Sequence, residues 1–124
     1  MEAPNILRLN CGIVGTTCHP LFRVPTGYGR MTILAAYLDP GIAAATIGNT
    51  YLVDAGTALG TAQATGGTLG TLAIANGTFT ADVQKAFSLV ATPVVDSGHW
   101  VSLNVVTGTT IVSSAVIVEY KWGK

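Results

Sequence analysis

The sequence predicts an all-β protein, a single antiparallel β-sandwich of the jelly-roll kind with an extended N-terminal arm. Glycine, proline and asparagine interrupt the chain about every ten residues, which is typical of a sandwich or barrel of short strands. The intervals between these breaks are rich in β-branched residues, and several alternate apolar and polar side chains. A chain of 124 residues is also long enough to build one core without cross-links.

The arm is expected to comprise residues 1–30, and the sandwich residues 31–124. Pro20, Pro25 and the glycine- and threonine-rich stretch from Cys11 to Cys18 discourage both a helix and a central strand. Chain ends stay ordered only where something holds them. The arm therefore either packs over its own sandwich or reaches across to a neighbouring molecule.

Three strands are expected in the middle of the chain. Met31–Leu38 is an apolar run that ends at Asp39-Pro40-Gly41, and it is predicted to be a largely buried strand. Ala44–Val53 carries apolar residues in phase, and Leu69–Ala75 ends at an Asn-Gly turn.

The segment Phe79–Thr92 permits two interpretations. Capped by Thr80, it could be a short helix with Val83, Phe87 and Val90 on one side. Alternatively, Phe87, Leu89 and Ala91 would lie on one face of a strand. We favour this strand, entered through a bend at Thr80–Gln84. Pro93 ends either structure.

The last third of the chain is predicted to be a β-hairpin. In His99–Val106, Val101, Leu103 and Val105 alternate with Trp100, Ser102 and Asn104, so that one face is apolar. The turn would be Thr107–Thr110. The second strand would be Ile111–Trp122, whose apolar face is formed by Val112, Val116, Val118, Tyr120 and Trp122.

The charge content excludes several classes of protein. Six Lys and Arg residues balance six Asp and Glu residues, and 10% of the chain is charged, where a typical domain has about a quarter. A nucleic-acid-binding surface requires clustered basic residues, and a disordered chain requires low hydrophobicity, whereas this chain is 49% hydrophobic. Neither a secretory signal nor a transmembrane helix is expected. With so few charges to keep copies apart, we expect much of the surface to be covered in use.

A metal site is not expected. Cys11, Cys18 and His19 lie close together in the sequence, and His99 could supply a fourth ligand, but the spacing does not match that of zinc sites. Two free thiols are favoured over a disulfide or a bound metal.

The residues do not match the catalytic or cofactor-binding motifs considered below, so the chain is predicted not to be an enzyme. Asp96, Ser97 and His99 are neighbours in what is predicted to be a tight turn, and such neighbours cannot easily form a triad. Gly66-Gly67-x-x-Gly70 lacks the Lys-Ser/Thr of a phosphate-binding loop. The scattered aspartates, Asp54 among them, are interpreted as turn formers.

Aromatic side chains are the remaining candidates for binding. Trp100 lies out of phase with the apolar residues of its strand, so it is either a contact to a partner or ligand or a cover over the sandwich rim. Trp100, Trp122, Tyr28 and Tyr37 could together form a platform for a sugar ring.

Four segments resemble small β-sandwich structural proteins of tailed-bacteriophage virions, of the capsid decoration (cement) or head-fibre type. They are Pro20–Pro25 (PLFRVP), Gly27–Leu34 (GYGRMTIL), Gly98–Asn104 (GHWVSLN) and Ala115–Tyr120 (AVIVEY). The resemblance implies a non-enzymatic virion protein, made in the host cytoplasm, that binds the major capsid protein as a homotrimer and stiffens the head shell. It implies no cofactor and no contact with nucleic acid or membrane.

Contact with the shell or with adjacent subunits is expected mainly from the arm. The alternative function is a carbohydrate- or receptor-binding module of a fibre or tail appendage, with Trp100 and a tyrosine in a shallow groove. The candidate contact residues are Ile6, Leu7, Leu9, Leu21, Phe22, Arg23 and Trp100.

Overall fold

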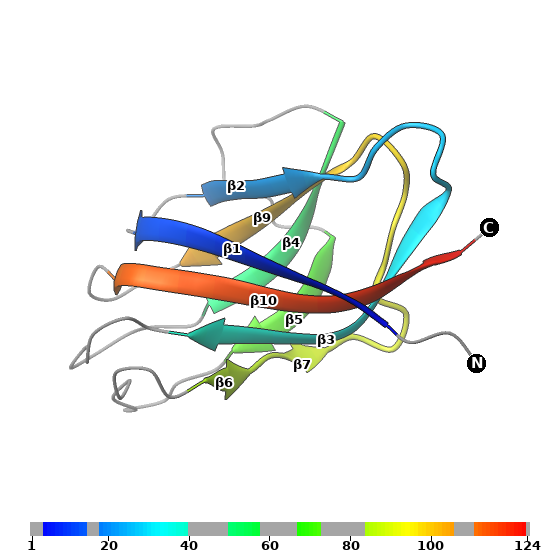
Figure 1. Cartoon of the computed structure of the whole chain (residues 1–124). Helices are drawn as coiled ribbons and strands as arrows, with labels where there is room; N and C mark the ends of the chain where they lie inside the picture. The colour runs from blue at the N-terminus through cyan, green and yellow to red at the C-terminus, as the bar shows by residue number, and fades with distance from the viewer. Residues whose placement is uncertain are drawn as a thin grey trace.

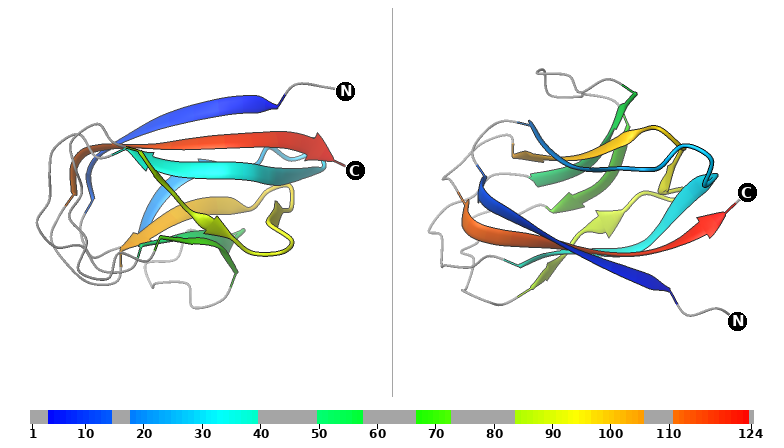
Figure 2. Two further views of the ribbon diagram at one scale, coloured as in Figure 1. Left: turned by 90° about the horizontal axis from the view of Figure 1, so that it is seen from below. Right: turned by 45° about the horizontal axis from the view of Figure 1, so that its top comes forward.

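The computed structural model describes residues 4–14, 18–39, 50–57, 67–72, 84–105 and 111–123. All regular structure in these residues is β-strand, and the strands form two antiparallel sheets that pack face to face (Figure 1). The left panel of Figure 2 shows the two layers. The expected antiparallel β-sandwich is thus confirmed. The strands are β1 (Asn5–Val14), β2 (Cys18–Arg23), β3 (Arg30–Asp39), β4 (Thr50–Gly56), β5 (Thr68–Leu72), β6 (Lys85–Ala86), β7 (Ser88–Leu89), β8 (Val94–Val95), β9 (Trp100–Val105) and β10 (Ile111–Gly123).

The strand order is that of a jelly roll. Sheet A has the order β1-β10-β3-β6, with β8 also paired to β3, and sheet B has the order β2-β9-β4-β5-β7. The antiparallel pairs are nested along the chain: β1 with β10, β2 with β9, β3 with β8, and β4 with β5. The chain therefore forms one long antiparallel ribbon, wrapped so that successive pairs lie in alternate sheets.

A short crossing segment joins the two sheets on one side of the sandwich. β6 pairs with β3 in sheet A, and β7 pairs with β5 in sheet B. Phe87 lies between these two short strands, and its N–H donates to the carbonyl of Ala36 at 2.8 Å. Its ring is buried against the core. The strand interpretation is therefore confirmed for Lys85–Ala86 and Ser88–Leu89, whereas the expected bend lies outside the described residues as far as residue 83.

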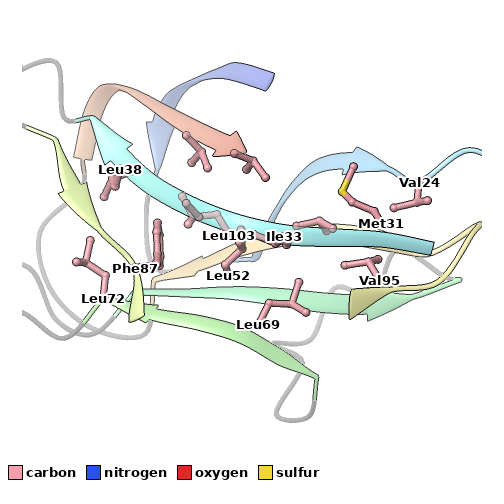
Figure 3. Close-up of a cluster of buried hydrophobic side chains, with 14 residues drawn as sticks. Val24, Met31, Ile33, Leu38, Leu52, Leu69, Leu72, Phe87, Val95 and Leu103 are labelled. Atoms are coloured by element: carbon pink, nitrogen blue, oxygen red, sulfur yellow. The ribbon is translucent and has the colours of Figure 1, made fainter. Parts of the chain in front are cut away.

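The hydrophobic core fills the space between the sheets (Figure 3). Both sheets contribute through their inward-facing residues, because alternate side chains of a strand point to opposite faces. The fully buried residues include Ile33 and Leu38 from β3, and Leu52 and Leu103 from the middle of sheet B.

The three strands expected in the middle of the chain are present where the structure describes them. Met31–Leu38 lies within β3, which is buried at alternate positions on either side of a bulge. Ala44–Val53 corresponds to β4 from Thr50 onward, and Leu69–Ala75 corresponds to β5 as far as Leu72. The remainders, 44–49 and 73–75, lie outside the described residues.

The segment predicted as an arm is extended and packs on its own sandwich. β1 pairs with β10 from Asn5 to Val14, and β2 pairs with β9 from Cys18 to Arg23. Each strand forms one edge of one sheet. These two strands are therefore part of the sandwich itself.

The predicted hairpin of the last third is wrong. β9 lies in sheet B between β2 and β4, while β10 lies in sheet A between β1 and β3. Both strands have the expected alternation, with Val101 and Leu103 of β9 and Val116 and Val118 of β10 buried. Their apolar faces meet across the core and not side by side, because each strand finds its partners in the first thirty residues and in the middle of the chain.

The polar face expected for β9 is also buried. Ser102 and Asn104 are 1% and 4% exposed, although they alternate with the core residues. Among the described residues, Ser102 Oγ and Asn104 Oδ1 have no hydrogen-bond partner. A period-two pattern therefore distinguishes the two faces of this strand without showing which of them solvent reaches.

Candidate functional site

One end of the sandwich brings together many of the polar and aromatic contacts. Figure 1 shows both chain ends and the β2–β3 connection on this side of the molecule. Two backbone hydrogen bonds tie the connections here: Val24 N–H donates to the His99 carbonyl at 2.9 Å, and Gly98 N–H donates to the Val24 carbonyl at 2.7 Å. We call it the terminal end. It comprises Arg23–Arg30, Asp54–Gly56, Asp96–Trp100 and Tyr120–Gly123.

A histidine and an aspartate form the most specific polar contact of the terminal end. His99 Nδ1 lies 3.0 Å from Asp54 Oδ1 and 3.1 Å from Oδ2. Because a carboxylate only accepts hydrogen bonds, Nδ1 carries the proton and donates it. Asp54 Oδ1 also accepts the N–H of Gly56 at 2.9 Å, so its carboxylate pairs with a nearby backbone N–H as expected, although Asp54 lies within β4 and not in a turn.

The His99–Asp54 pair was not expected from the sequence. Forty-five residues separate the two in the chain, and no local motif links them. The backbone carbonyl of the neighbouring Asp96 accepts the N–H of His99 at 3.2 Å, and its carboxylate Oδ1 pairs with Arg30 Nε at 3.0 Å. The turn expected at Asp96-Ser97-Gly98 is confirmed, with Gly98 at a positive φ of 82°.

Chemically, the His99–Asp54 pair resembles the base and orienting carboxylate of a triad. Among the described residues, however, Nε2 of His99 has no hydrogen bond to a hydroxyl or thiol. We therefore interpret the pair as a link that holds the end of β4 against the β8–β9 turn. The ion pair of Arg30 with Asp96 is exposed on both sides and contributes little, since exposed pairs typically contribute less than about 1 kcal/mol.

Three aromatic rings meet at the same end. The ring centroid of Trp122 lies 5.2 Å from that of Tyr28 and 5.3 Å from that of Tyr120, both edge to face. Such geometry favours aromatic pairs beyond the area they bury. Tyr28 is 60% exposed, so the cluster reaches the surface. We call these residues the aromatic cluster.

The cluster differs from the platform considered for a sugar ring. Tyr28 and Trp122 were both expected in it, and Tyr120 was not. Trp100 lies in sheet B, opposite Arg23 of β2 and Gly56 of β4. Tyr37 lies in sheet A, opposite Ile117 and Ala86. The structure thus brings two of the four aromatic residues together.

The predicted contact residues of β1 point to both faces of sheet A. Leu7 and Leu9 lie opposite the buried Val118 and Val116 of β10 and are half-buried. Ile6 lies on the other face and is 67% exposed, the highest value among the large hydrophobic side chains of the described residues.

The remaining predicted contact residues belong to sheet B. Leu21 and Phe22 are half-buried and pack against the core. Arg23 is exposed, and its Nε donates to the carbonyl of Gly98 at 3.2 Å. Trp100 is half-buried directly across from Arg23. Of the seven residues, Ile6 and Arg23 are the ones whose side chains are mainly exposed.

The outer face of sheet A is a second surface of interest. Opposed residues of antiparallel strands share a face, so that Ile6, Glu119 and Ala35 form one row across β1, β10 and β3. Leu34 lies beside this row, at the bulge of β3, and is 44% exposed. The next row contains Arg8, Ile117 and Tyr37. We call this surface the outer face.

The outer face carries few charges. Arg8 Nη2 lies 3.3 Å from Asp39 Oδ2, so that the ion pair spans β10 and the two charges offset each other. Ala115 of β10 lies directly opposite Asp39 and is buried. Apolar side chains are therefore exposed on a face that also carries this ion pair and the carboxylate of Glu119.

Metal ligands do not gather in the described residues: these contain no cluster of three or more His, Cys, Asp or Glu side chains suited to a cation. The side chains of Cys11, Cys18 and His19 lie outside the described residues. Within the same residues, no helix has the length and hydrophobicity needed to cross a membrane.

The nested pairing and the two-layer core define a jelly-roll β-sandwich, an architecture found in viral capsid proteins, lectins and cupins. Searches of protein-family models, curated proteins and solved structures find no match to this chain.

Proposed function

We propose that this chain is a structural protein of a tailed-bacteriophage virion, a decoration protein that binds the head shell and stabilises it. The main support is the outer face, where the two most exposed aliphatic side chains of the described residues, Ile6 and Leu34, lie on one charge-poor sheet surface. The resemblance to virion decoration proteins and the jelly-roll architecture agree with this role.

Whether a partner protein can cover the outer face depends on the free energy of burying its charged and aliphatic groups. Burying charged groups without partners is expensive, whereas burying aliphatic groups is favourable by about 25 cal/mol per Å². On the outer face, Arg8 already pairs with Asp39, whereas the carboxylate of Glu119 lies between the apolar residues Ile6 and Ala35. A shell protein can therefore cover most of this face at low desolvation cost, provided that it offers a basic or hydrogen-bonding group to Glu119. The partner is the major capsid protein, and the chain acts as a homotrimer on it.

Binding to heads tests this function. We expect the purified chain to co-sediment at a fixed stoichiometry with heads of the virus that encodes it, and to raise their disruption temperature. Leu34→Lys should weaken this binding by at least about tenfold, because it places a charge in the covered surface. Val90→Lys is the matched control, since Val90 is 41% exposed but follows β7 in the other sheet.

Equal binding by the Leu34 and Val90 variants would contradict the outer face as the contact surface. Failure of the unsubstituted chain to bind heads would contradict the function itself. Single substitutions are preferable to removal of residues 1–25, because that deletion takes away both β1 and β2 and the fully buried Val24.

A carbohydrate- or receptor-binding module of a fibre or tail appendage is the second candidate, and the aromatic cluster favours it. Tyr28→Ala should lower the affinity for a bound glycan by about tenfold, because the exposed ring is the one available for stacking on a sugar. Tyr37→Ala is the control, since Tyr37 lies away from the cluster on the outer face. A glycan array would show either binding that depends on Tyr28 or, against this function, no binding by the unsubstituted chain.

A further inference from the structure

The four sheet edges of the molecule differ in how open they are to another strand. In sheet A, the edge opposite β1 is formed by β6 and β8, and in sheet B the edge opposite β2 is formed by β7. Each of these three strands is two residues long. β2, the near edge of sheet B, has six residues and contains Pro20, which lacks an N–H group. Short strands and prolines are common means of preventing edge-to-edge association.

β1 has neither protection. It is ten residues long and contains no proline, and among the described residues its strand partner is β10 alone. Its register with β10 is regular from Asn5 to Asn10 and irregular from there to Val14, so the first half is the open part of the edge. Its one charged residue, Arg8, is paired with Asp39. A long edge strand of this kind offers backbone N–H and carbonyl groups to a further strand.

The side chains at the start of β1 also suit such an addition. Ile6 is 67% exposed on the outer face, and Leu7 is half-buried on the core side. A strand laid beside residues 5–8 would cover apolar groups on both faces of the sheet. The pairing would extend the core as well as the backbone ladder.

We propose that a second copy of this chain pairs its own β1 antiparallel to this edge. A two-fold axis through Leu7 places Leu7 opposite its counterpart and Ile6 opposite Arg8, so that no two arginines oppose each other. Because this contact is isologous, it closes with two chains and joins two five-stranded sheets into one. It does not depend on the proposed binding to heads.

Light scattering of the full chain over a concentration series tests the pairing. We expect a mass of two chains, or of six if the two-fold contact joins the proposed trimers. Ile6→Lys should raise the dissociation constant of the two-fold contact at least about tenfold, because it places two lysines beside two arginines across the axis. The product would be one chain, or three. Ile6 is mainly exposed, so the fold should persist, which circular dichroism and the thermal midpoint would check.

Leu34→Lys is the matched control, because Leu34 is exposed on the same face but belongs to β3, away from the edge. It should keep the mass of the unsubstituted chain. A mass of one or three chains for the unsubstituted protein would overturn the pairing, and so would an unchanged mass for Ile6→Lys or an equal loss for Leu34→Lys. The mass is measured without heads, so a failure of this pairing is distinguishable from a failure of head binding.

Discussion

Leu52→Ala is expected to lower the free energy of unfolding by about 4 kcal/mol, towards the upper end of the range for buried leucines. Leu52 is fully buried in β4, opposite Leu103 of β9 on one side and Gly70 of β5 on the other. The glycine has no side chain that could move into the space. Leu89 and Phe87 already lie close to Gly70, so they have little freedom to fill the cavity.

Chemical denaturation measures this effect as a shift of the unfolding midpoint at constant slope. Leu34→Ala removes the same atoms from an exposed position and should cost less than about 1 kcal/mol. Similar losses for the two variants would show that Leu52 does not lie in a closely packed core.

Gly67→Ala is expected to cost about 3 kcal/mol or more, the second large effect. Gly67 precedes β5 with a φ of 79°, a conformation that costs other residues about 1 to 2 kcal/mol. A Cβ atom there would lie 2.6 Å from the backbone oxygen of Asp54. Since Asp54 N–H donates to the Gly67 carbonyl at 2.8 Å, the two backbones cannot separate without losing that hydrogen bond.

Gly27→Ala separates the two causes. Gly27 has a φ of 91°, but a Cβ atom there would meet nothing within 4 Å. This variant should therefore show the conformational cost alone, about 1 kcal/mol. Thermal unfolding of both proteins measures the difference. Equal midpoints would mean that the close approach of Gly67 to Asp54 adds nothing to the loss of stability in Gly67→Ala.

The strands themselves were largely predictable because their signal is local. β3 was expected from the apolar run Met31–Leu38, and its bounds differ from that run by one residue at each end. In β10, Val116 and Val118 were assigned to the core face, and both are buried. Successive side chains of a strand point to opposite faces whatever the partner strands are. The pattern can therefore be recognised in the sequence of a single strand.

The partners of the strands were not predictable in the same way. Local proximity favoured a hairpin of β9 and β10, yet β10 pairs Tyr120 with Asn5, close to the opposite end of the chain. The contact of His99 with Asp54 has the same origin, since it depends on β4 and β9 lying side by side. In the sequence, Asp54 and His99 are each a single polar residue next to an apolar run, and nothing there connects the two.

The candidate surfaces combine both kinds of information. Ile6 could be named from the sequence as a contact residue, and the proposal of a charge-poor, covered surface follows from composition. Leu34 was treated as part of a buried strand. Its exposure results from the bulge of β3 opposite Glu119 and Tyr120. The sequence of this segment contains no pattern that predicts the bulge.

By itself, the sequence determined that this protein is a charge-poor β-sandwich and which side of β10 faces the core. Those properties follow from composition and from a two-residue repeat, both of which are local. The tertiary structure alone decided the nested jelly-roll pairing, the burial of Ser102 and Asn104, the His99–Asp54 link and the open edge at β1. Each of these depends on which distant strands lie together, and that is settled when the two sheets close over a common core.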